Sequence, residues 1–170
     1  MKTPVLAVVV TLFSGIMMAS GAQAGQAKMV WENPDKFTDI RPGMGTDRSY
    51  RKGLERALNG ALQKMAADLP ADQTFEITFT DIDLAGEIDP VELPGAHQLR
   101  LLKDAYFPRL VFDYRIVDAN GKLVAEQKGV ELKDMSYLRG NNAGSSSSDF
   151  YYETRMLKHW FNATLRPSKQ

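Results

Sequence analysis

Apolar side chains recur every three or four residues in one stretch of the first half of the chain. They are Leu54, Leu58, Ala61, Leu62, Met65 and Leu69. Such a stripe is typical of a helix that buries one face. Thr46 or Asp47 can accept a hydrogen bond from the free amides of the first turn, and Pro70 disfavours helical geometry at the residue before it. We therefore predict a helix over residues 47–69.

The segment that follows, "TFEITFTDIDL", alternates apolar and polar residues. Phe75, Ile77 and Phe79 are apolar with polar residues between them, and a period of two predicts a strand with one buried face. The alternation slips at Asp81 and resumes one residue out of phase. Because such a slip turns every later side chain to the opposite face unless it is absorbed, we expect a β-bulge at Asp81.

Residues 108–118 and 122–132 predict a β-hairpin around "DANG". A two-residue Asn-Gly turn is the strongest short hairpin signal, and it would place Arg115 opposite Glu126 and Phe112 opposite Gly129. A three-residue turn with a bulge fits the same residues and would shift the pairing. Both registers remain open at the level of sequence.

The remaining segments are shorter. Residues 28–32 and 99–102 favour short strands, and residues 149–163 predict a last helix. Its aromatic stripe, Tyr152, Trp160 and Phe161, is expected in the core, or at a binding surface if exposed. This element order predicts an α+β fold, in which a long helix from the N-terminal half and a C-terminal helix pack on a small, mainly antiparallel sheet. If the first two strands pair directly, the helix between them forms a parallel crossover.

The first 24 residues have the pattern of a secretory signal peptide. Lys2 precedes an apolar run over residues 5–18, and "AQA" at 22–24 is the small-x-small pattern of a cleavage site. The run is shorter than the ~20 residues that a membrane-spanning helix needs. We expect a periplasmic protein with one domain over residues 25–170, including a Ser/Gly/Asn-rich flexible loop at 140–149 and a tail at 166–170.

Composition narrows the chemistry. The chain has 21 basic and 21 acidic residues, two histidines and no cysteine. A balanced charge argues against a nucleic-acid partner. The missing cysteines exclude thiol catalysis, iron–sulfur clusters and cysteine-based zinc sites, and His97 and His159 do not form a helical pair for zinc.

Residues 81–92, "DIDLAGEIDPVE", partly match the calcium-binding loop of an EF-hand. Counted from Asp81, positions 3, 9 and 12 are Asp83, Asp89 and Glu92, and position 6 is Gly86. These are the positions at which such a loop takes carboxylate ligands and its glycine.

Three features oppose calcium binding. Ala85 at position 5 has no side-chain ligand, Pro90 stiffens the second half, and the preceding residues predict strand rather than helix. We therefore expect Asp81 to hold the bulge by accepting backbone amides, with Arg100 or Arg109 as its ionic partner. Calcium at residues 81–92 remains the alternative, and no other cofactor is predicted.

Catalytic constellations are weaker. Ser145–Ser148 with Asp149 and His159 lack the rigid nucleophile turn of a serine hydrolase. A pair of carboxylates could serve glycoside hydrolysis. The candidates for such a pair are Glu32, Asp39, Asp104 and Asp134.

Several stretches in fixed order resemble a known family. They are "VWENPDKFTDIRP" near the start of the mature chain, "FTDIDLAGE" at 79–87, "LRLLKDAYFPRLVFDYRIVDANGK" at 99–122, "ELKDMSY" at 131–137 and "YYETRMLKHWF" at 151–161. Together they are similar to the family of exported Gram-negative proteins catalogued as domain of unknown function 3016. The resemblance implies an exported single-domain protein and no activity. We expect a non-enzymatic periplasmic binding or accessory module, with an envelope protein or polymer as partner and a carboxylate-dependent hydrolase of an envelope polymer as the alternative.

The signal peptide gives the first testable prediction. Protein from the periplasmic fraction should begin at Gly25 on N-terminal sequencing, or at Lys28 if cleavage follows Ala27, because signal peptidase reads small residues before the cut. Cytosolic protein that retains Met1 would contradict export.

Overall fold

The structure, a computed structural model, describes residues 25–43, 46–88, 100–139 and 149–166. The expected signal peptide and most of the expected loop at 140–149 lie outside the described residues. Within them, neither helix combines the length and the apolar character that crossing a bilayer requires.

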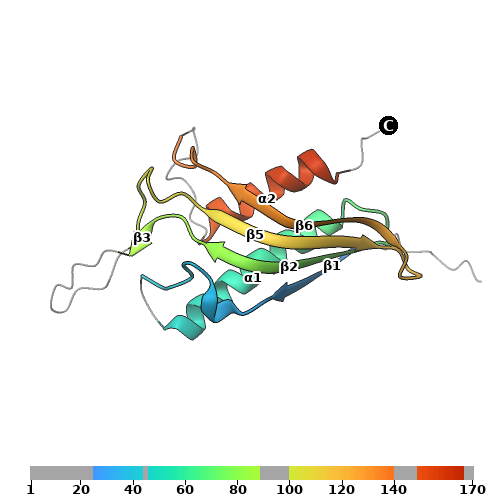
Figure 1. The fold of residues 1–170 in the computed structure, drawn as a ribbon, viewed down its shortest axis with the longest axis horizontal. Coiled ribbons are helices and arrows are strands. Elements are labelled where there is room, and N and C mark those ends of the chain that lie inside the picture. Colours follow the sequence, from blue (N-terminus) through green and yellow to red (C-terminus); the bar gives the residue numbers. More distant parts are fainter. Residues whose placement is uncertain (1–24, 44–45, 89–99, 140–148, 167–170) are drawn as a thin grey trace, which may run out of the picture.

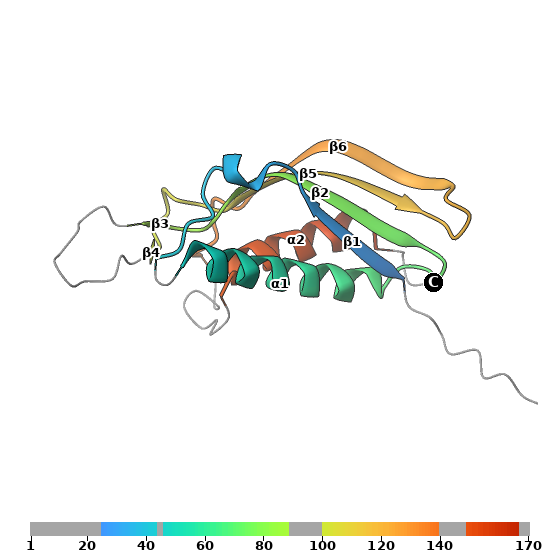
Figure 2. The same cartoon turned by 90° about the horizontal axis from the view of Figure 1, so that it is seen from below.

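Two helices lie against one face of a four-stranded sheet with the order β1-β2-β5-β6 (Figures 1 and 2). The elements are β1 (Gln26–Trp31), α1 (Asp47–Ala66), β2 (Thr74–Asp83), β5 (Arg109–Val117), β6 (Leu123–Lys133) and α2 (Tyr151–Thr164). β1 pairs with β2 in parallel across α1, and the other pairs are antiparallel. A second, two-stranded sheet joins β3 (Glu87–Ile88) to β4 (Arg100–Leu101). The predicted α+β class with a mainly antiparallel sheet is confirmed.

The apolar stripe of α1 packs into the core. Leu54, Leu58 and Leu62 are completely buried, and Thr46 caps the helix by accepting a hydrogen bond from the Ser49 amide at 3.3 Å. The helix ends at Ala66, three residues before the predicted end, because the last residues tighten into turns ahead of the proline.

α2 places its aromatic residues against the sheet. The Trp160 ring lies 4.9 Å from the Phe112 ring and 5.2 Å from the Tyr114 ring, centroid to centroid, and Phe161 is fully buried. The aromatic stripe is therefore core, as expected. The helix begins at Tyr151 rather than at 149 because Phe150 has a left-handed φ of 62°, which a right-handed helix does not accept.

The expected bulge in β2 is confirmed. The pairing of β2 with β5 shifts between Phe79 and Asp81. The bulge absorbs the change of phase, so Ile82 and Leu84 point into the core as Phe79 does.

The hairpin of β5 and β6 uses the three-residue turn. The Asp118 amide donates to the Lys122 carbonyl at 3.0 Å across residues 119–121. Gly121 adopts φ 77°, which favours glycine. The two-residue alternative is wrong for this turn.

The pairing within the hairpin is correct in part. Arg115 lies opposite Glu126 as expected, but Phe112 lies opposite Val130 rather than Gly129. Gly129, with φ 62°, forms a second bulge, and its amide donates to the Asp113 carboxylate at 2.7 Å. This extra residue shifts the register beyond it.

α1 contacts the free edge of β1 at Ala27. Gln63 donates from its amide nitrogen to the Ala27 carbonyl at 2.8 Å and accepts from the Ala27 amide at 3.3 Å. One side chain therefore satisfies both outward-facing backbone groups of Ala27, which blunts the edge against pairing with another chain.

The core predicts a contrast on α1. Leu62→Ala should lower the free energy of unfolding by about 2–5 kcal/mol because it leaves a cavity, whereas Lys64→Ala, two residues away and exposed, should change it by less than about 0.5 kcal/mol. Urea denaturation of both variants tests this, and equal losses would contradict the orientation of the helix.

Candidate functional site

Acidic and basic side chains gather where β2 ends. After the short 3-10 turn η1 (Pro34–Lys36), the chain rejoins the edge of β2 in the same direction as β1, and Asp39 forms a parallel bridge with Asp83. The Asp39 amide donates to the Ile82 carbonyl, and the Leu84 amide donates to the Asp39 carbonyl, both at 3.1 Å. This pairing brings together carboxyl groups that are 44 positions apart in the sequence.

Asp81 connects this segment, residues 37–40, to the sheet. Its carboxylate accepts hydrogen bonds from the amide and from the hydroxyl of Thr38, each at 2.7 Å, and it forms an ion pair with Arg109. Asp81 therefore accepts a backbone amide, as expected, and its ionic partner is Arg109 and not Arg100. The structural role of this acid is shown by three donors that converge on it.

Arg100 instead binds Asp39, whose side chain is nearly buried. Arg100 Nη2 lies 3.1 Å from Asp39 Oδ2, and the guanidinium donates to the carbonyls of Arg41 and Gly86 at 2.8 Å each. The Arg41 amide donates to the other oxygen of Asp39 at 3.0 Å. Asp39 Oδ2 and Arg100 Nε each have no hydrogen-bond partner among the described residues, so the pair of Oδ2 with Nη2 is an ion pair without a hydrogen bond of good geometry.

A second buried carboxyl lies at the start of α2. Glu153 is 2% exposed, and its Oε1 accepts the Ala85 amide at 2.8 Å. Burial raises the pKa of Glu153, opposed by the Ala85 amide and by the charge of Arg100. Burial also raises the pKa of Tyr50, where Arg100 opposes the rise and Glu153 adds to it. Arg100 therefore acts electrostatically on the two buried carboxyl groups, Asp39 and Glu153, and on the half-buried Tyr50.

Asp83 is the member of the cluster with the fewest partners. Burial raises the pKa of its carboxyl, Arg109 opposes the rise, and the nearby charges of Asp39 and Asp81 add to it. None of the described residues forms a hydrogen bond or an ion pair with the Asp83 side chain. Sequence reasoning did not find this pairing of Asp39 with Asp83, because the turn between β1 and Asp39 interrupts any alternation that would have marked residues 37–40 as sheet.

The other carboxylates proposed for hydrolysis lie apart from this cluster. Glu32 and Asp104 are exposed, and Asp134 pairs with Arg155 at 2.9 Å and accepts the Ser136 amide at 3.1 Å. Of the four candidates, Asp39 alone belongs to the cluster. His159 lies exposed on α2, whereas the serines at 145–148 lie outside the described residues.

The calcium hypothesis concerns the same strand end. Asp81 and Asp83 lie two residues apart on one face of β2, and Gly86 has φ 84° with the Leu101 carbonyl 2.7 Å from where a Cβ would stand. The positive φ and the close Leu101 carbonyl therefore account for a glycine at this position. Within the described residues no group of three or more acids or histidines is placed to hold a metal ion. Because Asp89 and Glu92 lie outside them, the structure does not test the expectation that these acids serve structure, and calcium binding stays the alternative.

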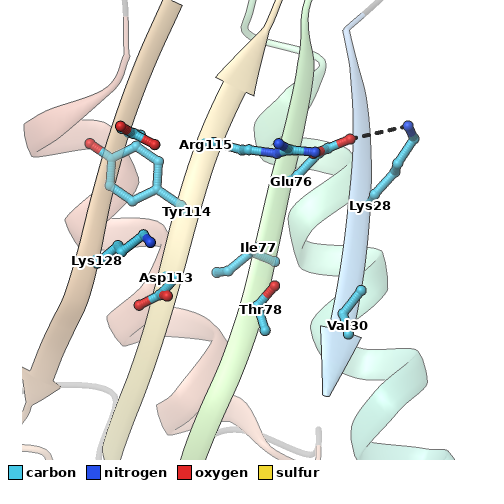
Figure 3. Close-up of a pocket in the computed structure, with 10 residues that line it drawn as sticks. Lys28, Val30, Glu76, Ile77, Thr78, Asp113, Tyr114, Arg115 and Lys128 are labelled. Carbon is cyan, nitrogen blue, oxygen red and sulfur yellow. Dashed lines mark hydrogen bonds and ion pairs between the residues drawn. The ribbon is translucent and has the colours of Figure 1, made fainter. Parts of the chain in front are cut away.

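The sheet face that the helices leave open carries paired charges (Figure 3). Lys28 on β1 lies 3.1 Å from Glu76 on β2, and Glu76 also pairs with Arg115 on β5. Burial acts to raise the pKa of Glu76, but the hydrogen bonds from Arg115 and Lys28 prevail and lower it. A shallow groove of about 440 Å³ lies over this row. Its charges largely neutralise one another, as on a solvated surface.

Comparison with known proteins gives one match. The family model described as Protein of unknown function (DUF3016) matches residues 25–163. No curated protein and no solved structure matches the chain.

The contacts of Asp81 predict a stability effect. Asp81→Ala should lower the free energy of unfolding by about 1–3 kcal/mol, because Thr38 and the Arg109 guanidinium lose a shared acceptor whose side chain is only 20% exposed. Asp35→Ala is the matched control, since Asp35 is 87% exposed in its pair with Arg51 and should cost less than about 0.5 kcal/mol. Calcium at 1 mM should leave the melting temperature unchanged. An increase that is lost in Asp83→Ala would establish a calcium site instead.

Proposed function

Because this chain belongs to the family Protein of unknown function (DUF3016), whose description assigns no activity, we propose a function from its surfaces and its charges. The mature chain is an exported, non-enzymatic binding module of the periplasm. Its partner is a polymer of the cell envelope.

The observation that carries this proposal is the way arginines and backbone amides engage the acids at the end of β2. A glycoside hydrolase needs two carboxyl groups that face a cleft, one to give a proton and one to act as base or nucleophile. Asp39 is held by Arg100 and by the Arg41 amide, and Asp81 by Thr38 and Arg109. Such contacts join the segment around Asp39 and the β3–β4 sheet to the main sheet, which supports a structural rather than a catalytic role.

The alternative, a carboxylate-dependent hydrolase, is favoured by one observation. The pKa of Asp83 is raised by burial and by the neighbouring acids Asp39 and Asp81. A carboxyl whose pKa is raised above that of a neighbouring carboxyl is the arrangement in which a general acid works. Asp83 is therefore the residue at which the two functions make different predictions.

An assay with insoluble cell-wall polymer distinguishes binding from hydrolysis. The purified mature chain, residues 25–170, should co-sediment with the polymer and release no soluble sugar fragments, and Asp83→Asn should co-sediment equally well. Asp35→Asn, an exposed acid on η1, is the control for a change of one charge.

The opposite outcomes are equally clear. Fragments released by the unmodified chain and not by Asp83→Asn would establish the hydrolase. A chain that stays in the supernatant and releases nothing would refute binding to this polymer.

A further inference from the structure

Another groove lies between α1 and α2, which run side by side under the sheet (Figure 2). It has a volume of about 840 Å³ and is lined by five cationic side chains and one carboxylate. The cations are Arg56, Lys64, Arg155, Lys158 and Arg166, and the carboxylate is Asp68. In a chain with equal numbers of acidic and basic residues, this is a local excess of positive charge.

Three of these cations have no acidic partner within the described part of the chain. Arg155 pairs with Asp134 and Arg166 with Asp68, whereas Arg56, Lys64 and Lys158 are exposed and form no such pair there. The groove over the open face of the sheet differs, because three cations and three carboxylates line it. Unpaired cations on the walls of a groove concentrate the field that attracts an anion.

The shape of the groove favours an extended ligand. Arg56 and Lys64 are eight residues apart on α1, which corresponds to about 12 Å along a helix axis. Small residues line it between them, namely Ala57, Gly60 and Ala61, and a Cβ added at Gly60 would meet nothing within 4 Å. The groove is therefore long and open, with no deep pocket described for a single small anion.

We propose that this groove binds a linear sugar chain that carries carboxylates. The proposal rests on the proposed function and names the chemistry of its polymer. The unpaired cations would bind the carboxylates. Tyr151, His159 and Asn162 line the same groove and offer hydroxyl, imidazole and amide groups to the hydroxyls of the sugars.

Two other anionic partners fit less well. A peptide gains most of its affinity from large apolar side chains seated in pockets, and the small residues of this groove provide none. Docking to a membrane surface uses exposed apolar side chains beside the cations. The large apolar side chains that are exposed in the described residues lie outside the groove: Val30, Leu102, Tyr106, Leu123, Val124 and Met135.

The test uses oligomers of polygalacturonate, a linear carboxylated sugar chain, and isothermal titration calorimetry of residues 25–170. The double variant Arg56→Glu/Lys158→Glu should weaken binding by roughly tenfold or more, since each 1.4 kcal/mol of lost attraction is tenfold in Kd. Lys52→Glu/Lys128→Glu is the matched control, because it reverses two exposed lysines outside the groove and should stay within about twofold. Raising the salt concentration should weaken binding to the unmodified chain, and neutral dextran should not bind.

Circular dichroism shows whether each variant is folded. If the double variant does not fold, the single variants Arg56→Glu and Lys158→Glu replace it in the titration. No binding of polygalacturonate, or equal loss in the control pair, would overturn the proposal. Equal affinity for polyglutamate would overturn the assignment to sugar, and co-sedimentation with anionic vesicles would assign the groove to a lipid surface instead. If the double variant still co-sediments with cell-wall polymer, the groove proposal fails while the proposed function stands.

Discussion

The burial of aromatic side chains between α2 and the two central strands is the interaction on which the rest of this structure depends. Phe75 of β2 lies within 5.7 Å of the Phe161 ring, and Phe112 of β5 lies within 4.9 Å of the Trp160 ring. Aromatic side chains bury more apolar area than other residues. Their concentration on one face of the sheet therefore decides which face the two helices cover, and the face left open must be compatible with water.

That constraint explains how charge is used at the end of the sheet. Phe37 and Ile40 of the segment around Asp39 join the core, and polar contacts connect the same segment to β2 and to β4. Arg100 forms an ion pair with Asp39 and acts through its charge on Glu153 and on the half-buried Tyr50, and removing that charge leaves the buried carboxyls uncompensated. The raised pKa of Glu153 means that the folded state binds its proton more tightly than the unfolded state does. Its ionisation therefore opposes folding as the pH rises above the pKa that the Glu153 carboxyl has in the unfolded chain.

The sequence predicted the elements whose signal is local and periodic. The stripe of α1 and the phase slip at Asp81 each lie within one element, so the position of helix and bulge followed from spacing alone. The shift at Gly129 was not predictable in this way, because it depends on the positive φ of one glycine and on the Asp113 carboxylate across the hairpin. The choice of Arg109 over Arg100 as partner of Asp81 depends on the order of strands, which no local pattern records.

The sequence identified residues of the candidate site but not how they are arranged in space. Asp39, Asp81 and Asp83 were singled out for two separate chemistries, and their meeting depends on a parallel bridge formed after an irregular turn. A long-range contact of this kind costs chain entropy and produces no periodic pattern in the sequence.

The pairing of charges then separates surfaces that hold the fold from surfaces that are available to a partner. On the open sheet face, Lys28, Glu76 and Arg115 satisfy one another across three strands, so a charged ligand would have to displace existing ion pairs to bind there. Between the helices, Arg56, Lys64 and Lys158 stand apart from acids within the described residues, and their mutual repulsion slightly opposes the folded state. A bound polyanion relieves that repulsion and gains attraction from the same side chains. The helix groove, rather than the sheet, is therefore the surface where an anion would gain most in free energy from this fold.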